Sequence, residues 1–132
     1  MNSKILIDKA QQAKKNSFSP YSKLRVGAAI ISTSGKIFTG CNIENSSYSL
    51  TVCAERTAIF KAISEGYRDF AAIAIVSDLK EPVPPCGACR QVLLDLAGNV
   101  DLFLSGTNGK TKRLKLAELL PMPFDQSFLN HK

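Results

Sequence analysis

The sequence has no tryptophan, no internal repeat and no low-complexity segment, and its apolar runs are short. None of them approaches the roughly 20 residues that a helix needs to cross a bilayer. Charged residues interrupt the first sixteen positions, so we expect no signal peptide and no membrane span, and a cytoplasmic location. With 132 residues, of which 45% are apolar, the chain is expected to form one domain over residues 1–132, with a polar and loose tail from about residue 125.

The net charge of +6 is not accompanied by the aromatic pattern of a nucleic-acid-binding protein. Basic side chains gather at residues 14–15 and 110–115, where they could steer anions. Proteins that bind single strands interleave such charges with aromatic rings on which bases stack. We therefore interpret the charge as a solvated surface and expect no nucleic-acid partner.

Apolar residues at helical spacing mark the N-terminal segment. They predict a helix that begins at a capping residue, Asn2 or Ser3, and runs to about residue 16. Pro20 follows, and its ring removes a hydrogen-bond donor and disfavours helical geometry in the residue before it. The first helix is therefore expected to end before this proline.

A hairpin is predicted next. Residues 24–32 and 37–41 are apolar and partly β-branched, and turn-forming residues at 33–36 separate them. This pattern predicts two antiparallel strands. Gly27 inside the first strand indicates either a bulge or the close approach of another backbone.

The second helix is predicted over residues 52–65, after a polar loop at 42–49. Thr51 has a side chain suited to capping, and Gly66 stands where helices commonly end. Residues 71–76 are apolar without alternation, which is typical of a central strand buried on both faces. Such a strand requires helices on both sides of its sheet.

The remaining segments complete the sheet. A third helix is predicted over residues 87–97 and a fourth strand over 100–104. The Asn108–Gly109 pair is typical of a hairpin turn into a fifth strand that ends near Leu116, and residues 118–121 suggest a short turn. The order α-β-β-α-β-α-β-β predicts an α/β fold, a three-layer α/β/α sandwich around a five-stranded mixed sheet.

Three of the four cysteines lie at predicted helix starts. Cys86 and Cys89 are three residues apart, which places both sulfurs on one side of a first helical turn. Cys53 lies at the start of the preceding helix, and helix N-termini favour thiolates over thiols. Three protein ligands leave the fourth tetrahedral position of zinc for water, as in catalytic sites, so we expect one Zn²⁺ per chain.

Glu55 and Arg56 follow the first of these cysteines closely. A carboxyl group beside a metal-activated water can move protons, which makes Glu55 the predicted catalytic residue. Zn²⁺ with three thiolates carries a net negative charge. Our hypothesis is that the two helix N-termini and Arg56 offset this charge.

Two less specific interpretations stay open. Cys41 could complete a four-sulfur structural site, although it lacks the paired spacing that commonly supplies ligands. Glu55 could be an ordinary first-turn glutamate that complements the helix dipole. The chain would then be a zinc-stabilised interaction module, which gives no reason for a glutamate at this place.

These motifs resemble those of a known family. Cys53-Ala54-Glu55 together with Pro85-Cys86-x-x-Cys89 matches the three-cysteine signature of zinc nucleobase deaminases. More narrowly, the chain resembles the small homotetrameric cytidine deaminases of nucleoside salvage. The segments that carry this similarity are residues 18–22, 40–45, 51–56, 85–91, 119–121 and 124. They extend over nearly the whole chain.

The resemblance implies roles for further residues. Asn42 and Glu44 would bind the ribose, Glu44 through the 3′-hydroxyl. Tyr48 would shape the sugar end across a subunit interface, and Phe124 would cover the pyrimidine from a neighbouring subunit. Leu24 stands where many relatives have phenylalanine, so one wall of the base pocket is expected to be aliphatic.

The implied activity is the zinc-dependent hydrolytic deamination of cytidine and deoxycytidine, with release of ammonia, by a homotetramer. An enzyme acting on another aminopyrimidine nucleoside-like compound would share this metal chemistry, as would a nucleic-acid cytosine deaminase. The nucleic-acid enzymes commonly use histidine as the first ligand, whereas this chain has Cys53. The antiparallel final hairpin predicted above is also that of the free-nucleoside enzymes.

Overall fold

The computed structural model describes residues 3–129, so the predicted cap Asn2 lies outside the described residues. Within this range, helices and strands follow one another in the predicted order. They are α1 (Ser3–Lys14), β1 (Val26–Ser32), β2 (Ile37–Cys41), α2 (Ala54–Ser64), β3 (Phe70–Ser77), α3 (Gly87–Ala97), β4 (Asp101–Ser105) and β5 (Thr111–Lys115). Short 3-10 helices lie between and after them: η1 (Tyr48–Leu50), η2 (Leu116–Leu119) and η3 (Gln126–Phe128).

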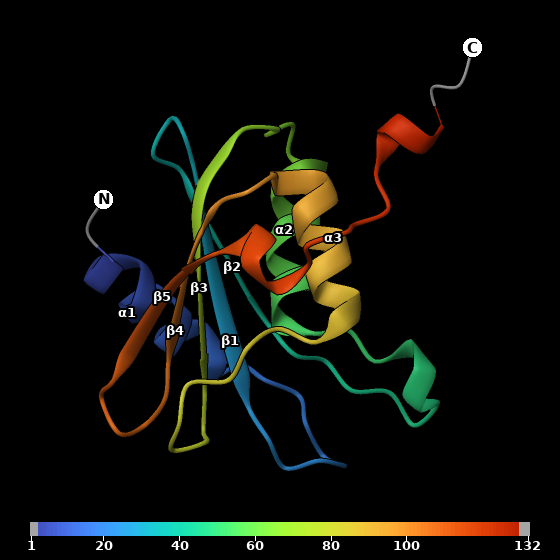
Figure 1. The fold of residues 1–132 in the computed structure, drawn as a ribbon. Coiled ribbons are helices and arrows are strands. Elements are labelled where there is room, and N and C mark those ends of the chain that lie inside the picture. Colours follow the sequence, from blue (N-terminus) through green and yellow to red (C-terminus); the bar gives the residue numbers. More distant parts are fainter. Residues whose placement is uncertain (1–2, 130–132) are drawn as a thin grey trace.

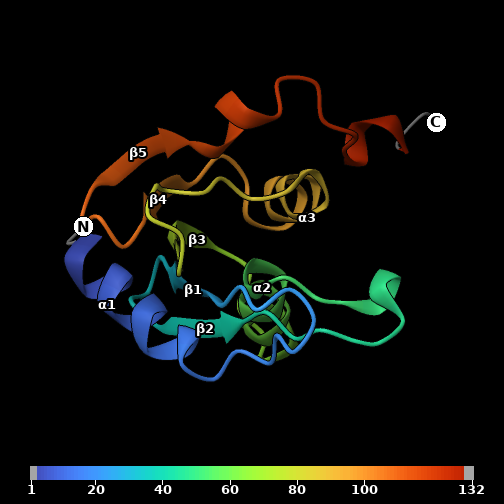
Figure 2. The same cartoon turned by 90° about the horizontal axis from the view of Figure 1, so that it is seen from below.

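The predicted three-layer sandwich is confirmed. Five strands form one sheet in the order β2-β1-β3-β4-β5. Strands β3 and β4 are parallel and the other neighbouring pairs are antiparallel, so the sheet is mixed. Helix α1 covers one face, while α2 and α3 lie side by side on the other (Figures 1 and 2). No helix within residues 3–129 has the length and apolar character needed to cross a membrane.

Strand β3 is central, as its unbroken apolar run predicted. Ile73 and Ile75 belong to the buried cluster that includes residues of α2 and α3. Ala72, Ala74 and Val76 belong to the cluster that includes residues of α1. Alternate residues of one strand therefore bury both faces of the sheet and hold the two helical layers in place.

Two glycines let helices rest directly on the sheet. A Cβ atom at Gly27 would lie 2.1 Å from the carbonyl oxygen of Ala10 in α1. A Cβ atom at Gly40 would lie 2.6 Å from backbone atoms of both Ala54 and Ala58 in α2. The predicted close approach at Gly27 is confirmed, whereas the irregularity in the register of β1 lies at the other end of that strand.

The start of α2 differs from the prediction. The backbone of Val52 pairs with Ile43 in an isolated bridge, so this residue does not begin the helix. The N-cap of α2 is Cys53 rather than Thr51, and the first helical residue is Ala54. Backbone pairing in the preceding loop, which helical periodicity does not report, thus shortens the helix.

The C-terminal segment also differs from the prediction. The tail from Asp125, which we expected to be loose, includes the 3-10 helix η3. The Asp125 side chain accepts a hydrogen bond from the amide of Ser127 and caps this helix. A local side-chain bond therefore orders a stretch whose polar composition alone suggested none.

Candidate active site

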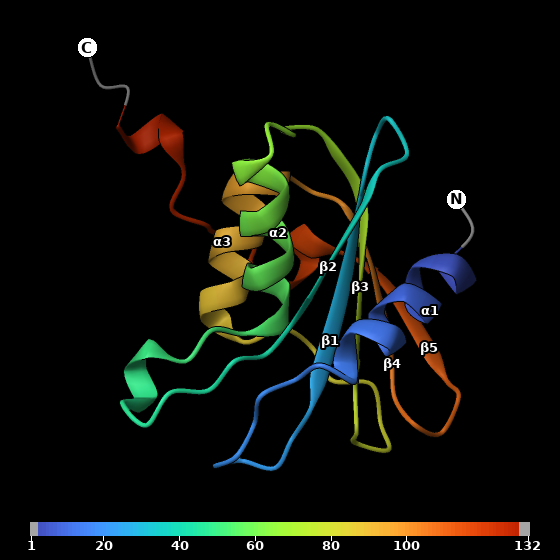
Figure 3. The ribbon, with the colours of Figure 1, turned by 180° about the vertical axis from the view of Figure 1, so that it is seen from behind.

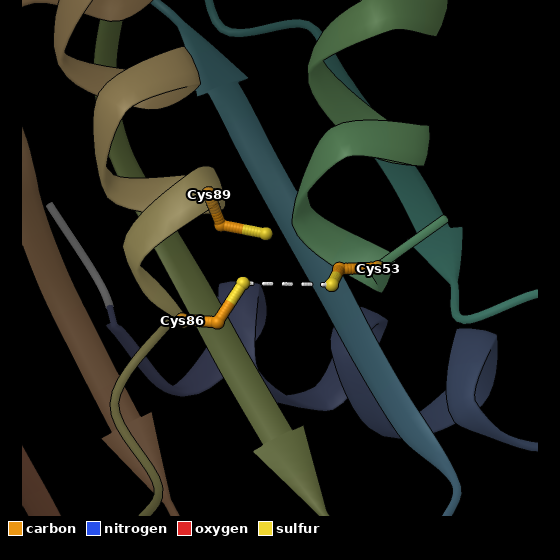
Figure 4. Close-up of side chains that lie close together, drawn as sticks. All are labelled: Cys53, Cys86 and Cys89. Atoms are coloured by element: carbon orange, nitrogen blue, oxygen red, sulfur yellow. Dashed lines mark hydrogen bonds between the residues drawn. The ribbon is translucent and has the colours of Figure 1, made fainter. Parts of the chain in front are cut away.

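Three cysteine side chains converge where the N-terminal ends of α2 and α3 meet (Figure 4). Cys53 is the N-cap of α2, Cys86 is the N-cap of α3, and Cys89 lies in the first turn of α3. The three sulfur atoms all lie within 4.8 Å of one another, and those of Cys53 and Cys86 are 3.7 Å apart. Two helix starts thus bring distant parts of the sequence to one point.

The sulfurs of Cys53 and Cys89 influence each other's protonation. A hydrogen bond with the Cys89 thiol, and then one from the Arg56 guanidinium, lowers the pKa of Cys53 to about 5. The pKa of Cys89 rises well above its usual range because its proton is held against Cys53 and its side chain is buried. Without a metal, the cluster therefore carries one negative charge readily, whereas a second is unfavourable. A bound divalent cation would offset the additional negative charge.

Three sulfurs that converge on one point are a donor set that Zn²⁺ favours. The residues present therefore fit the metal that the sequence predicted, and they leave one tetrahedral position for a ligand from outside the chain. Cys41 takes no part. It ends β2, and the metal-ligand group found within residues 3–129 contains Cys53, Cys86 and Cys89 without it. The four-sulfur alternative is therefore wrong.

The carboxyl group of Glu55 is buried beside the sulfurs. It lies in the first turn of α2, is 4% exposed, and lines the same cavity as Cys53 and Cys86. Burial raises its pKa to about 7, and the negative charge of Cys53 contributes to this rise. A glutamate that only complemented a helix dipole would gain nothing from burial, so its position favours a catalytic role.

Arg56 lies next to the sulfur of Cys53. Its Nη2 atom is 3.5 Å from that sulfur and 3.4 Å from the carbonyl oxygen of Thr51. Its Nε atom is buried and has no hydrogen-bond partner in the part of the chain that the structure describes. A guanidinium at this distance stabilises a negative sulfur; the electrostatic role that the sequence suggested for Arg56 stays a prediction.

A cavity of about 250 Å³ adjoins the cysteines, and the predicted residues Leu24, Asn42 and Glu44 line it. Several apolar residues that line this cavity were not predicted from the sequence. These are Val26, Ile75, Val83 and Pro84. The last two shortly precede Cys86 and could have been found from that position. The first two lie within strands, where their pattern is the same as that of core residues.

Tyr48 and Phe124 do not line this cavity within their own chain. Tyr48 lines an adjoining hollow with Tyr21, and the centroids of the two rings are 5.7 Å apart. Phe124 lies beside α3, with Leu94, in a separate hollow of about 620 Å³ that none of the cysteines lines. The structure therefore places neither ring in the lining of the cavity of its own chain.

Asn42 is buried and ties the start of β1 to the end of β2. Its Oδ1 accepts hydrogen bonds from the amide of Val26, at 3.0 Å, and from the hydroxyl of Ser17. Its Nδ2 donates to the carbonyl oxygen of Leu24 at 2.8 Å. The side chain is therefore fixed, and only part of its hydrogen-bonding capacity remains for a ligand.

Glu44 is held by the segment that precedes β1. Its Oε1 accepts hydrogen bonds from the amides of Tyr21 and Ser22, and its Oε2 accepts one from the Ser22 hydroxyl. The bond from the Ser22 hydroxyl is the main cause that lowers the pKa of Glu44. The group therefore stays ionised at neutral pH and acts as an acceptor.

Sequence comparison agrees with this geometry. The family model described as the cytidine and deoxycytidylate deaminase zinc-binding region matches residues 1–103. The chain is 48% identical to a cytidine deaminase from Halalkalibacterium halodurans, over 98% of this chain and 99% of that protein. A more distant relative, the blasticidin-S deaminase of Bacillus cereus, is 35% identical over 80% of each chain.

Structural comparison gives the same result. The crystal structure of a cytidine deaminase from Burkholderia pseudomallei matches this fold with a TM-score of 0.91 and 44% sequence identity. The match covers 94% of this chain and 100% of that one. With its three converging sulfurs and its buried glutamate, this chain therefore belongs to the zinc-binding family of cytidine and deoxycytidylate deaminases.

Proposed function

We propose that this chain converts cytidine and deoxycytidine into uridine and deoxyuridine, with consumption of water and release of ammonia. The observation that carries this proposal is the composition of one cavity. Cys53, Cys86 and the buried Glu55 line it, and so do Asn42 and Glu44. A pyrimidine nucleoside needs this combination, because its base must meet the metal while its sugar meets polar side chains.

Cys53, Cys86 and Cys89 would hold one zinc ion. When bound, zinc supplies Lewis-acid activation of the water that attacks C4 of the pyrimidine. The chain's own contribution is to bring three sulfurs together and to offset their charge. Arg56, at 3.5 Å from the sulfur of Cys53, is the side chain placed for that purpose.

Glu55 would move the protons. Its carboxylate takes one proton from the attacking water and delivers it to N3, which makes C4 electrophilic. It then transfers the remaining proton of that water to the amine at C4, and the C4–N bond breaks to release ammonia. The carboxylate returns to its starting state. A pKa of about 7 suits a group that must both accept and donate a proton.

Asn42 and Glu44 have the capacity to recognise one hydroxyl group. Asn42 Oδ1 already accepts two hydrogen bonds and one Nδ2 hydrogen is used, which leaves one donor. Glu44 Oε1 accepts two hydrogen bonds and Oε2 accepts one, which leaves an acceptor site on Oε2. One donor and one acceptor complement a single hydroxyl. We assign them to the 3′-hydroxyl, which ribose and deoxyribose share.

A second candidate activity is the deamination of another aminopyrimidine nucleoside-like compound. The aliphatic wall at Leu24 favours it, because a pocket without an aromatic ring at this position has a different shape. The relative from Bacillus cereus is named a blasticidin-S deaminase. Comparing kcat/KM for cytidine, free cytosine and such compounds separates the two activities. A preference for cytidine over both supports our first proposal.

We further propose that the chain acts as a homotetramer in the cytoplasm. Figure 3 shows η1 and the C-terminal segment projecting from the side of the sandwich that carries α2 and α3. Both projections carry exposed apolar side chains: Tyr48 is 73% exposed, Met122 91% and Phe124 59%. Assembly would cover them and would place Tyr48 and Phe124 at the cavities of neighbouring copies.

A dilution series tests the assembly. Specific activity and sedimentation are measured on the same samples, and activity should fall as the assembly dissociates. Monomers with full activity would contradict the proposed role of neighbouring copies.

The activity itself is tested by the fall in absorbance as purified protein converts cytidine into uridine, with zinc measured on the same sample. We expect turnover with about one zinc per chain. Zinc without activity on cytidine or deoxycytidine would favour the other aminopyrimidine substrates. Full activity without zinc would overturn the proposed site.

A further inference from the structure

Ser22 lies between Glu44, which is proposed to bind the sugar, and Leu24, which is proposed to flank the base. Its hydroxyl donates a hydrogen bond to Oε2 of Glu44 and accepts one from the amide of Leu24 at 3.1 Å. All three residues line the same cavity. One hydroxyl group therefore connects the carboxylate at the sugar to the backbone of the base wall.

The backbone that follows Ser22 has an uncommon shape. Lys23 has a φ of 62°, and it is the only non-glycine residue with positive φ within residues 3–129. Residues with a Cβ atom rarely adopt this left-handed conformation. The amide of Lys23 also donates to the carbonyl oxygen of Ser19 at 3.1 Å, which closes a tight turn. Such a turn persists only where its surroundings hold it.

Glu44 supplies this support. Its Oε1 accepts the amide hydrogens of Tyr21, at 2.9 Å, and of Ser22, at 3.1 Å. Its own amide donates to the carbonyl oxygen of Phe18 at 2.8 Å. The turn is therefore built on Glu44, and the same contacts determine where the free acceptor site of Oε2 points.

We propose that Ser22 is a positioning residue for substrate recognition. Its hydroxyl orients Glu44 Oε2 toward the 3′-hydroxyl of the nucleoside and fixes the backbone of Leu24 at the base wall. The single hydroxyl hydrogen is engaged by Glu44, so Ser22 acts through that carboxylate rather than by donating to the substrate. This inference rests on the proposed function and identifies the residue that sets its sugar specificity.

The experiment compares the Ser22→Ala variant with the wild type on cytidine and on 3′-deoxycytidine. In the wild type, loss of the 3′-hydroxyl should lower kcat/KM by roughly 10- to 100-fold, as expected for a hydrogen bond to a charged group. In Ser22→Ala, kcat/KM for cytidine should fall about tenfold, mainly through KM. The value for 3′-deoxycytidine should fall much less, so the ratio between the substrates should shrink by about fivefold.

Two further variants isolate the hydroxyl group. Ser22→Thr retains it and should restore the wild-type ratio between the substrates. Ser22→Cys has nearly the same size but a weaker donor, and it should give an intermediate ratio. The cysteine variant also keeps the test available should Ser22→Ala fail to fold. Ser34→Ala makes the same change in the turn between β1 and β2 and should leave both substrates unaffected.

The outcomes distinguish this inference from the function on which it rests. A wild-type enzyme without activity on cytidine would overturn the proposed function. An active wild type whose Ser22→Ala variant lowers kcat/KM equally for both substrates would overturn the role of Ser22 alone, because a merely structural residue affects both. Zinc content and thermal unfolding of each variant identify those that are intact.

Discussion

The side-chain amide of Gln91 binds both backbone polar groups of Phe124. Its Nε2 donates to the Phe124 carbonyl oxygen at 2.5 Å, and its Oε1 accepts from the Phe124 amide at 3.3 Å. Gln91 lies in α3, two residues after Cys89. The helix that carries two of the three sulfurs therefore also anchors the ring that is proposed to reach the cavity of a neighbouring copy.

Replacing Gln91 with alanine is expected to weaken substrate binding without loss of zinc. Both hydrogen bonds disappear, so Phe124 is no longer held, and KM for cytidine should rise by roughly tenfold while kcat changes less. Phe124→Ala should have an effect in the same direction. Because the two side chains act through one contact, the double variant should be less impaired than the sum of the single effects. Steady-state kinetics check this, with Gln12→Ala on the exposed side of α1 as the control; additive effects would contradict the link.

Glu55→Gln should retain zinc and bind cytidine but lose nearly all turnover. The amide is similar in shape, yet it cannot carry a proton from water to the base. We expect kcat to fall by about 10³-fold or more. Glu65→Gln, at the exposed end of the same helix, should leave kcat unchanged. Substantial turnover in Glu55→Gln would remove this residue from the mechanism.

Removal of the metal should destabilise the fold, because the folded chain brings the three sulfurs together to bind it and the unfolded chain does not, so its binding free energy adds to the free energy of unfolding. A chelator is expected to lower the thermal midpoint of the wild-type protein. Cys89→Ser should lose zinc, and its midpoint should not respond to the chelator. Cys41→Ala should behave as the wild type does. Zinc loss in Cys41→Ala comparable to that in Cys89→Ser would restore the four-sulfur site.

The ion pairs of Asp78 are expected to make the free energy of unfolding depend on pH in a specific way. Arg25 Nε lies 2.8 Å and Lys14 Nζ 3.1 Å from its carboxylate, and the bond from Arg25 is the main cause that lowers its pKa to about 2. The unfolded chain has the ordinary value of about 3.9, so it takes up the proton first as the pH falls. The stabilisation is therefore complete above about pH 4 and is lost between about pH 4 and pH 2.

Asp78→Asn should accordingly lower the free energy of unfolding by about 1 kcal/mol at pH 7, after allowance for solvent screening. The difference from the wild type should vanish near pH 2. Denaturant unfolding across this pH range checks the prediction. Asp8→Asn, which removes an exposed ion pair with Lys4, serves as the control and should have a much smaller effect. A difference that did not change with pH would exclude the ionic origin.

The metal ligands could be predicted from sequence because their spacing is local. Cys86 and Cys89 lie within one turn at the start of α3, so their sulfurs are close together. Cys53 lies at the start of another helix, α2. The helix boundary beside them could not be predicted, since Val52 is drawn out of α2 by its pairing with Ile43, and such a bridge depends on a loop that folds back. Val26 and Ile75 could not be predicted to line the cavity either, because their pattern along the strands is the same as that of residues in the hydrophobic core.

The roles proposed for Tyr48 and Phe124 came from the family resemblance, and they remain predictions. Within one chain both rings are exposed and lie outside the cavity. Periodicity and burial describe contacts inside one chain, so they carry no information about a ring that works in another. Ser22 escaped sequence reasoning for a different reason: its importance comes from two hydrogen bonds to Glu44 and Leu24, which no spacing rule anticipates.

Gly40 has no Cβ atom, so α2 can pack closely against it, and the position of the active-site residues on α2 depends on this contact. The first turn of α2, with Cys53 and Glu55 at its start, rests on this glycine with no room for a methyl group. An added Cβ would push that helix, its sulfur and its carboxyl group away together, while the two sulfurs of α3 stayed behind. A substitution at a residue that does not line the cavity would then act as an active-site mutation. Mutational screens restricted to the residues that line the cavity would overlook it.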